Sequence, residues 1–404
     1  MIETYTLKNG LRIVLEPVEN VRSVSIGIWI LTGSRNETLE NNGVSHFLEH
    51  MLFKGTKTRS AQDIAEAFDS IGGNVNAFTA KEYTCYYARV LDTYQELALE
   101  VLADMFFNSV LSEDELAREK KVIMEEIKMY EDSPDNLVHH LLSKAMFGNH
   151  SLGRSILGTA ANLEAMTRET LVDYMEDYYV PNNIVISIAG NVEKEFIEKV
   201  EKHFASFSRP NRETIREKPL FIYDSITNEK EIEQAHVCFG FPGLAAKDEA
   251  AVSLAVINSS LGVGMSSRLF QEVREKRGLA YSVYSFHNAY VDSGMLGIYA
   301  GTNKEQLPVL REAVDETIAR LVEESLTEKE LLNKKEQLKG NILLSLENTS
   351  SRMSRNGRNE LLLNRHRTLD QITEEIDAID SSLIRQTLDM IFSGRHAEAI
   401  IQPK

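Results

Sequence analysis

Apolar residues recur along the chain with two different periods, which predict a mixture of strands and amphipathic helices. Runs rich in Val, Ile and Tyr are typical of strands, whereas apolar residues spaced three and four apart are typical of helices. In the first half, the pattern predicts strands at residues 11–17, 23–32, 74–79, 82–91 and 184–190. It predicts a helix within residues 43–53 and further helices at about 60–70, 93–108, 112–132, 136–147, 168–179 and 194–206. Residues 207–233 are polar and proline-containing, and are interpreted as a linker.

The second half repeats this plan. Residues 234–241 are predicted to form a strand like 23–30, and 252–258 align with 44–50. Residues 326–331 align with 111–116, and both segments begin a helix with a Ser or Thr followed three residues later by Glu. These two pairs of similar segments occur in the same order in both halves, which indicates an internal duplication. The predicted fold is therefore α+β, with two duplicated halves at 1–215 and 216–404, each a mostly antiparallel sheet flanked by helices.

Composition restricts the classes of function. The chain has 404 residues and a formal net charge of −17, which argues against nucleic acid as a partner. The charge serves solubility, or it attracts basic peptides to an acidic interior. No apolar run approaches the roughly 20 residues of a membrane span, no signal peptide is visible, and Cys85 and Cys238 make no disulfide framework. We therefore expect a cytoplasmic protein without a membrane partner.

A His-x-x-Glu-His motif within the helix-like stretch at 43–53 is the strongest candidate for chemistry. On a helix, His46 and His50 lie about 40° apart, and Glu49 about 60° to one side of His46. Two imidazoles on one face can bind Zn²⁺, and an adjacent carboxylate can accept a proton from water. The same residues could equally be polar groups of a half-buried helix. The duplication favours function, because the corresponding residues are Leu254, Ile257 and Asn258, which cannot perform this chemistry.

A catalytic zinc usually takes three protein ligands, and the helix at 112–132 offers candidates for the third. Glu119 and Glu126 are seven residues apart and lie within about 20° of one helix face. Their counterparts in the second half are Lys334 and Asn341, neither of which is an acid. Glu125 points about 100° away from Glu126 and is interpreted as a solvated acid. Spacing alone leaves open that the whole helix is a solvated charged surface.

The segment Gly-Val-Ser-His-Phe-Leu-Glu-His-Met-Leu-Phe-Lys-Gly-Thr at 43–56 resembles the signature of the pitrilysin/insulinase family of inverted zinc peptidases. The most similar branch is that of the mitochondrial processing peptidases and their short bacterial members. The Val-Ile-Met-Glu-Glu-Ile segment at 122–127 resembles the setting of the family's third ligand. The resemblance implies zinc on His46, His50 and Glu126, with Glu49 as general base and Glu119 as a supporting acid of the catalytic site.

Two further segments resemble the family. Residues 72–79 are similar to the strand whose exposed edge pairs with the substrate backbone, although an ordinary hairpin explains the Gly pair equally well. Residues 274–281 are similar to the segment whose Arg and Tyr reach the substrate, which implies catalytic and binding roles for Arg274 and Tyr281. The residues implied to bind substrate on the edge strand are Asn74, Asn76, Ala77, Phe78 and Thr79.

Together these resemblances imply a zinc endopeptidase that cleaves short, unfolded peptides or presequences in a closed chamber. The resemblance implies a chamber built from two pairs of halves, and this chain contains one pair. We therefore expect a homodimer, with a heterodimer that includes an inactive homologue as the alternative. Two other hypotheses stay open at this point. One is a non-catalytic structural subunit with the same fold, and the other is a metal hydrolase of non-peptide amides. The metal content of the protein distinguishes the structural subunit from the peptidase. Cleavage tests with a panel of substrates distinguish the hydrolase of non-peptide amides from the peptidase.

Overall fold

The computed structural model describes residues 2–210 and 216–404, which form two compact units. Unit 1 contains residues 1–128, 155–216 and 345–366, and unit 2 contains residues 129–154, 217–344 and 367–404. The boundary predicted between 215 and 216 borders the stretch 211–215, which is outside the described residues. Each unit therefore takes segments from both halves of the sequence.

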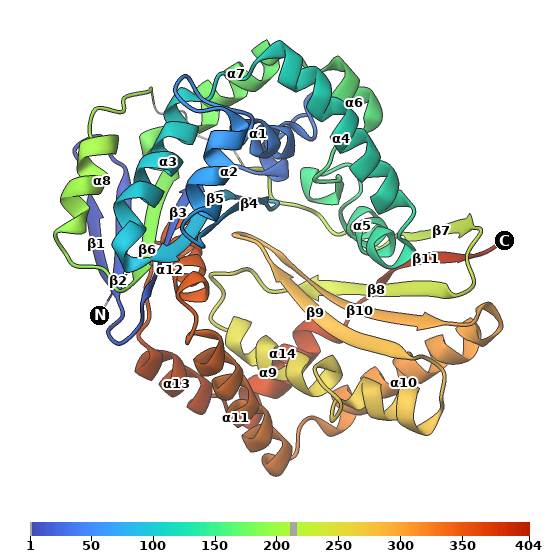
Figure 1. The fold of residues 1–404 in the computed structure, drawn as a ribbon. Helices are drawn as coiled ribbons and strands as arrows, with labels where there is room; N and C mark the ends of the chain where they lie inside the picture. Colours follow the sequence, from blue (N-terminus) through green and yellow to red (C-terminus); the bar gives the residue numbers. More distant parts are fainter. Residues whose placement is uncertain (1, 211–215) are drawn as a thin grey trace. The chain divides into compact units, whose positions relative to one another are not determined.

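Unit 1 is built on a sheet with the strand order β1-β2-β6-β3-β5-β4 (Figure 1). β2 and β6 are parallel, and the other neighbours are antiparallel. β4 lies at one edge of this sheet, with its other side unpaired among the described strands. The strands are β1 (Glu3–Thr6), β2 (Arg12–Pro17), β3 (Ser23–Ile30), β4 (Asn74–Thr79), β5 (Thr84–Leu91) and β6 (Ile184–Gly190).

Most helices of unit 1 pack on one face of this sheet and enclose its largest apolar core. The α-helices are α1 (Val44–Leu52), α2 (Ala61–Asp69), α3 (Gln95–Asn108), α4 (Glu113–Glu131, in unit 1 up to Lys128), α6 (Ala160–Ala165), α7 (Arg168–Tyr178), α8 (Phe196–Phe204) and α12 (Thr349–Leu363). Short 3-10 helices occur at η1 (Ser34–Asn36), η2 (Asp92–Tyr94) and η4 (Pro181–Asn183).

Unit 2 repeats the arrangement with the strand order β7-β11-β8-β10-β9, in which only β7 and β11 are parallel. The strands are β7 (Ser225–Lys230), β8 (Ala235–Gly243), β9 (Ser282–Ala289), β10 (Gly294–Thr302) and β11 (Ala397–Pro403). The helices are α5 (Pro134–Phe147), α9 (Ala251–Gly262), α10 (Leu307–Glu324), α11 (Glu328–Ser345), α13 (Leu369–Asp377), α14 (Ser381–Phe392), the π-helix η5 (Phe270–Lys276), and the 3-10 helices η3 (Ser151–Gly153) and η6 (Lys304–Gln306).

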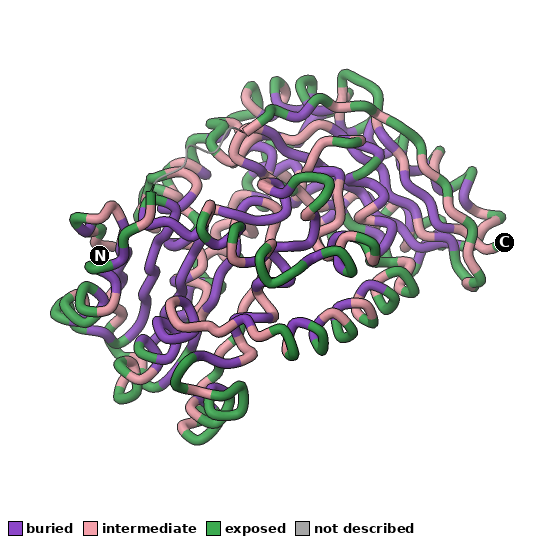
Figure 2. The backbone as a smooth tube through the Cα atoms, turned by 90° about the horizontal axis from the view of Figure 1, so that it is seen from above, coloured by how far each residue is buried: buried purple, intermediate pink, exposed green. Residues whose placement is uncertain are grey.

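The two units exchange one long helix. α12 comes from the second half of the sequence but packs on β3 and β6 of unit 1, whereas α5 comes from the first half and packs on β8 and β11 of unit 2. The inner strands of both sheets are largely buried along their length, whereas the edge strands β1, β4, β7 and β9 are more exposed (Figure 2). A sheet with two apolar faces needs cover on both sides. The exchanged helix therefore covers the face that each unit's own helices leave open.

The predicted fold class is confirmed: two duplicated units each contain a mostly antiparallel sheet flanked by helices. The prediction that 207–233 is only a linker is wrong, since β7 lies within it and pairs with β11. Its alternating charged and polar residues hid the strand, because β7 is an edge strand and buries little of its surface. The short β1 and α6 were not predicted.

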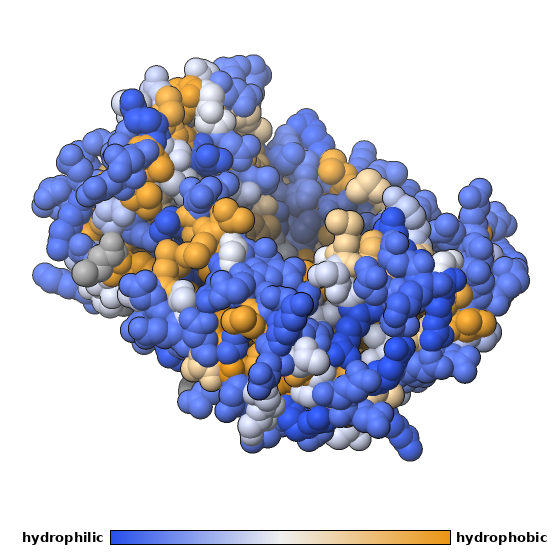
Figure 3. Space-filling model, turned by 90° about the horizontal axis from the view of Figure 1, so that it is seen from below, coloured by the Kyte–Doolittle hydropathy of each residue, from blue (hydrophilic) through white to orange (hydrophobic). Residues whose placement is uncertain are grey.

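The surface agrees with the composition. Figure 3 shows one face of the molecule, on which hydrophilic residues predominate, as expected for a chain in which 26% of the residues are charged. Both cysteines are buried and free. Among the described residues, no helix has the length and apolar character that crossing a membrane requires.

Candidate metal centre

Helix α1 carries the His-x-x-Glu-His motif, and its apolar residues fix which face remains for chemistry. Its apolar side chains, among them Val44, Phe47, Leu48 and Met51, are buried in the core of unit 1. At 100° per residue, this burial leaves one face of α1 for His46, Glu49 and His50, as the spacing predicted. α1 packs against β4 and α7, so that this face lies beside the edge strand of the sheet.

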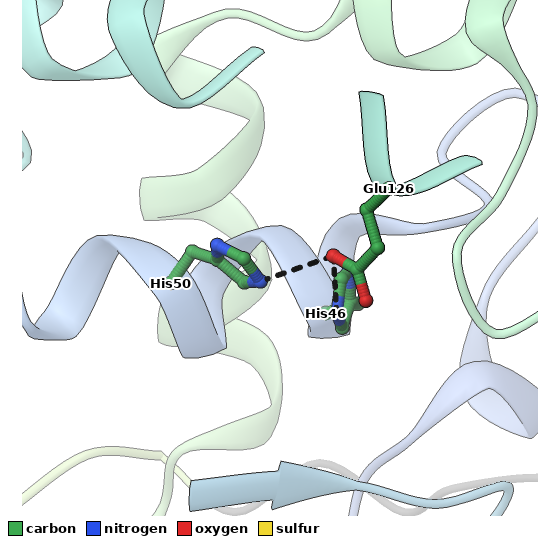
Figure 4. Close-up of side chains that lie close together, drawn as sticks. All are labelled: His46, His50 and Glu126. Carbon is green, nitrogen blue, oxygen red and sulfur yellow. Dashed lines mark ion pairs between the residues drawn. The ribbon is translucent and has the colours of Figure 1, made fainter. Parts of the chain in front are cut away.

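The side chains of His46, His50 and Glu126 converge (Figure 4). One Glu126 carboxylate oxygen lies 3.7 Å from His46 Nε2 and 3.6 Å from His50 Nε2. One ligand atom from each residue lies within 4.8 Å of the others, and no second cluster of this kind occurs in the described part of the chain. Glu126 reaches the histidines from α4, whereas the adjacent Glu125 points to solvent and pairs with Lys128.

The donor set fits zinc. Two imidazole nitrogens and one carboxylate oxygen are ligands that a catalytic zinc site uses. Burial lowers the pKa of His46 to about 3, with a smaller contribution from the charge of His50, so this imidazole is in the neutral form that binds metal. Nδ1 of His46 is buried and has no hydrogen-bond partner among the described residues. Its Nε2 is the nitrogen that faces Glu126.

Glu119 orients His50. Its Oε2 lies 3.0 Å from His50 Nδ1, and its Oε1 lies 2.6 Å from the Lys54 ammonium. The Glu119 side chain is only 4% exposed, so both interactions are shielded from water. A carboxylate on Nδ1 places the proton there and leaves Nε2 free to bind a metal. Glu119 is therefore placed to orient His50, and the ammonium of Lys54, which the sequence did not predict as a site residue, lies against it. The supporting role of Glu119 at a metal site stays a prediction.

We expect the substitution Lys54→Met to weaken zinc binding by about 10–100-fold, the range found when an outer partner of a metal ligand is removed. The substitution takes away both the hydrogen bond and the positive charge that hold Glu119. Titration of the metal-free protein with zinc against a chromophoric chelator measures the change. Lys57→Met is the matched control, since Lys57 is exposed, and an equal effect in both variants would contradict this role of Lys54.

Glu49 is connected to the edge strand. Its Oε2 accepts a hydrogen bond from Thr79 Oγ1 at 2.5 Å. Burial raises the pKa of the Glu49 carboxyl, and the Thr79 hydrogen bond opposes that shift. The sequence predicted Thr79 as a substrate-binding residue and did not predict this contact. Glu49 thus lies between the face of α1 that carries the ligands and the strand to which a peptide could be added.

The edge strand β4 offers backbone groups to a partner. Hydrogen-bonded and outward-facing residues alternate in an antiparallel pair. The Ala80 N–H donates to the Tyr83 carbonyl at 2.8 Å, so the even-numbered residues of β4 are the ones that bond to β5. The N–H and C=O groups of the residues between them, Val75, Ala77 and Thr79, therefore point away from β5. The outward N–H of Ala77 donates to the side chain of its own neighbour, Asn76.

Two other strand residues with predicted binding roles present their side chains differently. Asn74 is exposed, whereas the ring of Phe78 contacts Trp29, Tyr83 and Tyr87. The binding roles of these residues stay predictions.

Arg274 and Tyr281 lie together in unit 2. The Arg274 guanidinium donates to the Tyr281 carbonyl at 2.9 Å and lies 4.4 Å from the centre of the Tyr281 ring. Arg274 belongs to the π-helix η5, an irregularity that is frequent at functional sites. Tyr281 is 79% exposed, so it is accessible to a ligand. The candidate ligands belong to unit 1, and the action of Arg274 and Tyr281 on substrate stays a prediction.

The corresponding positions in unit 2 carry no metal chemistry. Leu254 and Ile257 on α9 are fully buried in the apolar core. Asn258 Oδ1 accepts a hydrogen bond from Ser285, and the Lys334 ammonium donates to Ser266 and Gln337. The same fold therefore forms with apolar side chains where α1 carries His46 and Glu49.

Two family models match successive parts of the chain. The family model described as insulinase, peptidase family M16, matches residues 12–160, and the model described as the peptidase M16 inactive domain matches residues 165–338. The chain belongs to the insulinase family, peptidase family M16. It is a zinc metallopeptidase, which hydrolyses peptide bonds.

Curated relatives and solved structures match over nearly the whole chain. A Bacillus subtilis protein named uncharacterized zinc protease YmxG is 57% identical over 403 residues, covering 100% of this chain and 98% of the relative. A zinc protease of Streptomyces coelicolor is 41% identical, covering 98% of this chain and 89% of the relative. A protease from Helicobacter pylori has the same fold, with a TM-score of 0.93 at 24% identity, covering 100% of this chain and 99% of that structure.

Proposed function

We propose that this M16 peptidase is an endopeptidase that cleaves unfolded peptides aligned on β4, with Glu49 as the general base. The hydrogen bond between Thr79 and Glu49 carries the proposal, because it connects the edge strand to the acid beside the ligand cluster. A peptide added to β4 would place its backbone beside Glu49. Strand addition needs an extended partner, which favours unfolded peptides over folded proteins.

His46, His50 and Glu126 would hold the zinc, and Glu119 and Lys54 would keep His50 oriented. Zinc held there supplies a Lewis acid that polarises the peptide carbonyl and increases the acidity of a coordinated water. Glu49 accepts the proton of the attacking water and then delivers it to the nitrogen of the leaving amine.

Arg274 and Tyr281 would provide hydrogen-bond donors for the developing oxyanion or for the substrate backbone. The substrate would be a short peptide or a presequence, and the net charge of −17 favours a basic one.

We expect Ala77→Pro to raise KM about fivefold, the equivalent of one lost backbone hydrogen bond of roughly 1 kcal/mol. Proline removes the outward N–H of Ala77 but leaves the ladder between β4 and β5, which uses other residues. Steady-state cleavage of an unstructured, basic fluorogenic peptide of about 20 residues measures KM and kcat. Ala77→Val is the matched control, since it keeps the N–H, and unchanged KM in both variants would contradict strand addition.

We further propose a homodimer that encloses the substrate in a chamber and acts in the cytoplasm. The family resemblance supports the dimer, because two pairs of halves build the chamber and this chain contributes one catalytic and one inactive half. Sedimentation of the purified chain should then give the mass of two chains, and a single-chain mass for the fully active enzyme would contradict the dimer. The cytoplasmic location is supported by the two free cysteines, and fractionation of the cell tests it.

A further inference from the structure

The helix that carries the candidate ligands is capped by a carboxylate from outside the helix. α1 begins after Gly43, whose side chain cannot accept a hydrogen bond. Glu37 takes this role: its Oε1 accepts the N–H of Ser45 at 2.9 Å, and its Oε2 accepts the N–H of Gly43 at 2.8 Å. Oε2 also accepts the side-chain N–H of Asn42 at 2.7 Å. Glu37 is 4% exposed, so these hydrogen bonds are shielded from water.

The usual cap is sterically excluded at this helix. Gly43 has a φ of +102°, in the left-handed region that favours glycine. A Cβ atom at this position would lie 2.7 Å from the Leu157 carbonyl oxygen, closer than side chains tolerate. A Ser, Thr, Asp or Asn at the N-cap would therefore collide with the backbone of residues 157–158. The N–H groups of the first turn need another acceptor, and a buried acid from the preceding loop supplies it.

The cap acts directly beside a ligand. Ser45, whose N–H binds Glu37, immediately precedes His46. The Ser45 hydroxyl is also within hydrogen-bond distance of the Tyr174 hydroxyl, at 2.9 Å, which ties the same turn to α7. α1 has only nine residues, so its first turn is a large part of the helix. Loss of the cap would free the turn that carries His46, while His50 would stay fixed by Glu119.

We propose that Glu37 is a positioning residue for the metal centre, which holds the first turn of α1 so that His46 converges with His50 and Glu126. The proposal rests on the proposed ligand set. A negative charge at this end of the helix is also favoured by the helix dipole. The role differs from that of Glu119, because Glu37 acts through the backbone of α1 and not through an imidazole ring.

The test is Glu37→Gln, which keeps the shape of the side chain but replaces one acceptor oxygen by an NH₂ group. We expect the zinc dissociation constant to rise about 10-fold or more, within the range for outer partners of a metal site. The absorption spectrum of the Co²⁺-substituted protein should change as well, because His46 would no longer converge with the other ligands. Glu66→Gln, which alters an exposed acid on α2, is the matched control.

A purely structural role predicts a different result. Glu37→Gln would then lower the melting temperature but leave zinc affinity and the Co²⁺ spectrum unchanged, which would overturn the proposal. If Glu37→Gln does not fold, Asn42→Ala decides, because it removes one donor to Glu37 and keeps the carboxylate. Unchanged zinc affinity in Asn42→Ala would overturn the proposal, and weakened affinity would support it. The proposed ligand set is tested separately by Glu126→Gln. If that variant retains zinc, the assignment of Glu126 as a ligand is contradicted, but the role of Glu37 as the cap of α1 is not.

Discussion

Replacing Glu49 by Gln is expected to lower kcat by about 10²–10⁴-fold, the usual contribution of a general acid–base group. The amide has nearly the same shape but cannot accept the proton from water. Zinc content should stay at the wild-type level, because Glu49 is not one of the three converging residues. Cleavage of the unstructured peptide measures kcat, and elemental analysis of the same samples measures zinc.

Thr79→Val is the companion variant for Glu49. It removes the hydroxyl that donates to Glu49 but leaves the acid in place, so its effect on kcat should be much smaller. Wild-type cleavage by a Glu49→Gln enzyme that holds zinc would contradict the assignment of Glu49 as the base. A zinc-free Glu49→Gln enzyme would instead indicate that Glu49 takes part in metal binding.

The second large effect is expected from Glu126→Gln, which should weaken zinc binding by more than the roughly 10–100-fold that outer partners contribute. The substitution removes the only acid among the three converging residues, and peptide cleavage should be lost together with the metal. Competition with a chromophoric chelator measures the affinity.

The adjacent residue on α4 provides the control for Glu126. Glu125→Gln changes an acid of the same type on the same helix, but its side chain is 73% exposed and pairs with Lys128. Zinc affinity and cleavage should stay at the wild-type level in Glu125→Gln. Equal losses in the two variants would contradict the choice of Glu126 as the third ligand.

Local spacing predicted the part of the site that lies on a single helix. The positions of His46, Glu49 and His50 on one face of α1 follow from helical periodicity and from the apolar residues between them. Spacing also identified Glu119 and Glu126 as residues of one face of α4, but it gave no reason to bring α4 to α1. The family resemblance supplied that connection, and the converging side chains agree with it.

The contacts that the sequence did not predict depend on tertiary packing. Lys54 reaches Glu119 across 65 residues of sequence, and Glu37 caps α1 because the backbone at Leu157 excludes a side chain at Gly43. α5 and α12 each pack on a sheet formed mainly by the other half of the sequence. An amphipathic pattern shows that a helix has an apolar face, but it does not specify which sheet that face contacts. β7 was missed because an edge strand needs few apolar residues.

His46, His50 and Glu126 are the residues that we propose bind the zinc of this peptidase. A crystal structure of the zinc-loaded protein, with anomalous scattering measured at the zinc edge, tests this assignment most directly. We expect one strong anomalous peak at about 2.0–2.2 Å from His46 Nε2, His50 Nε2 and a Glu126 carboxylate oxygen. A peak bound to other residues, or no peak at this site in an enzyme that cleaves peptides, would contradict it.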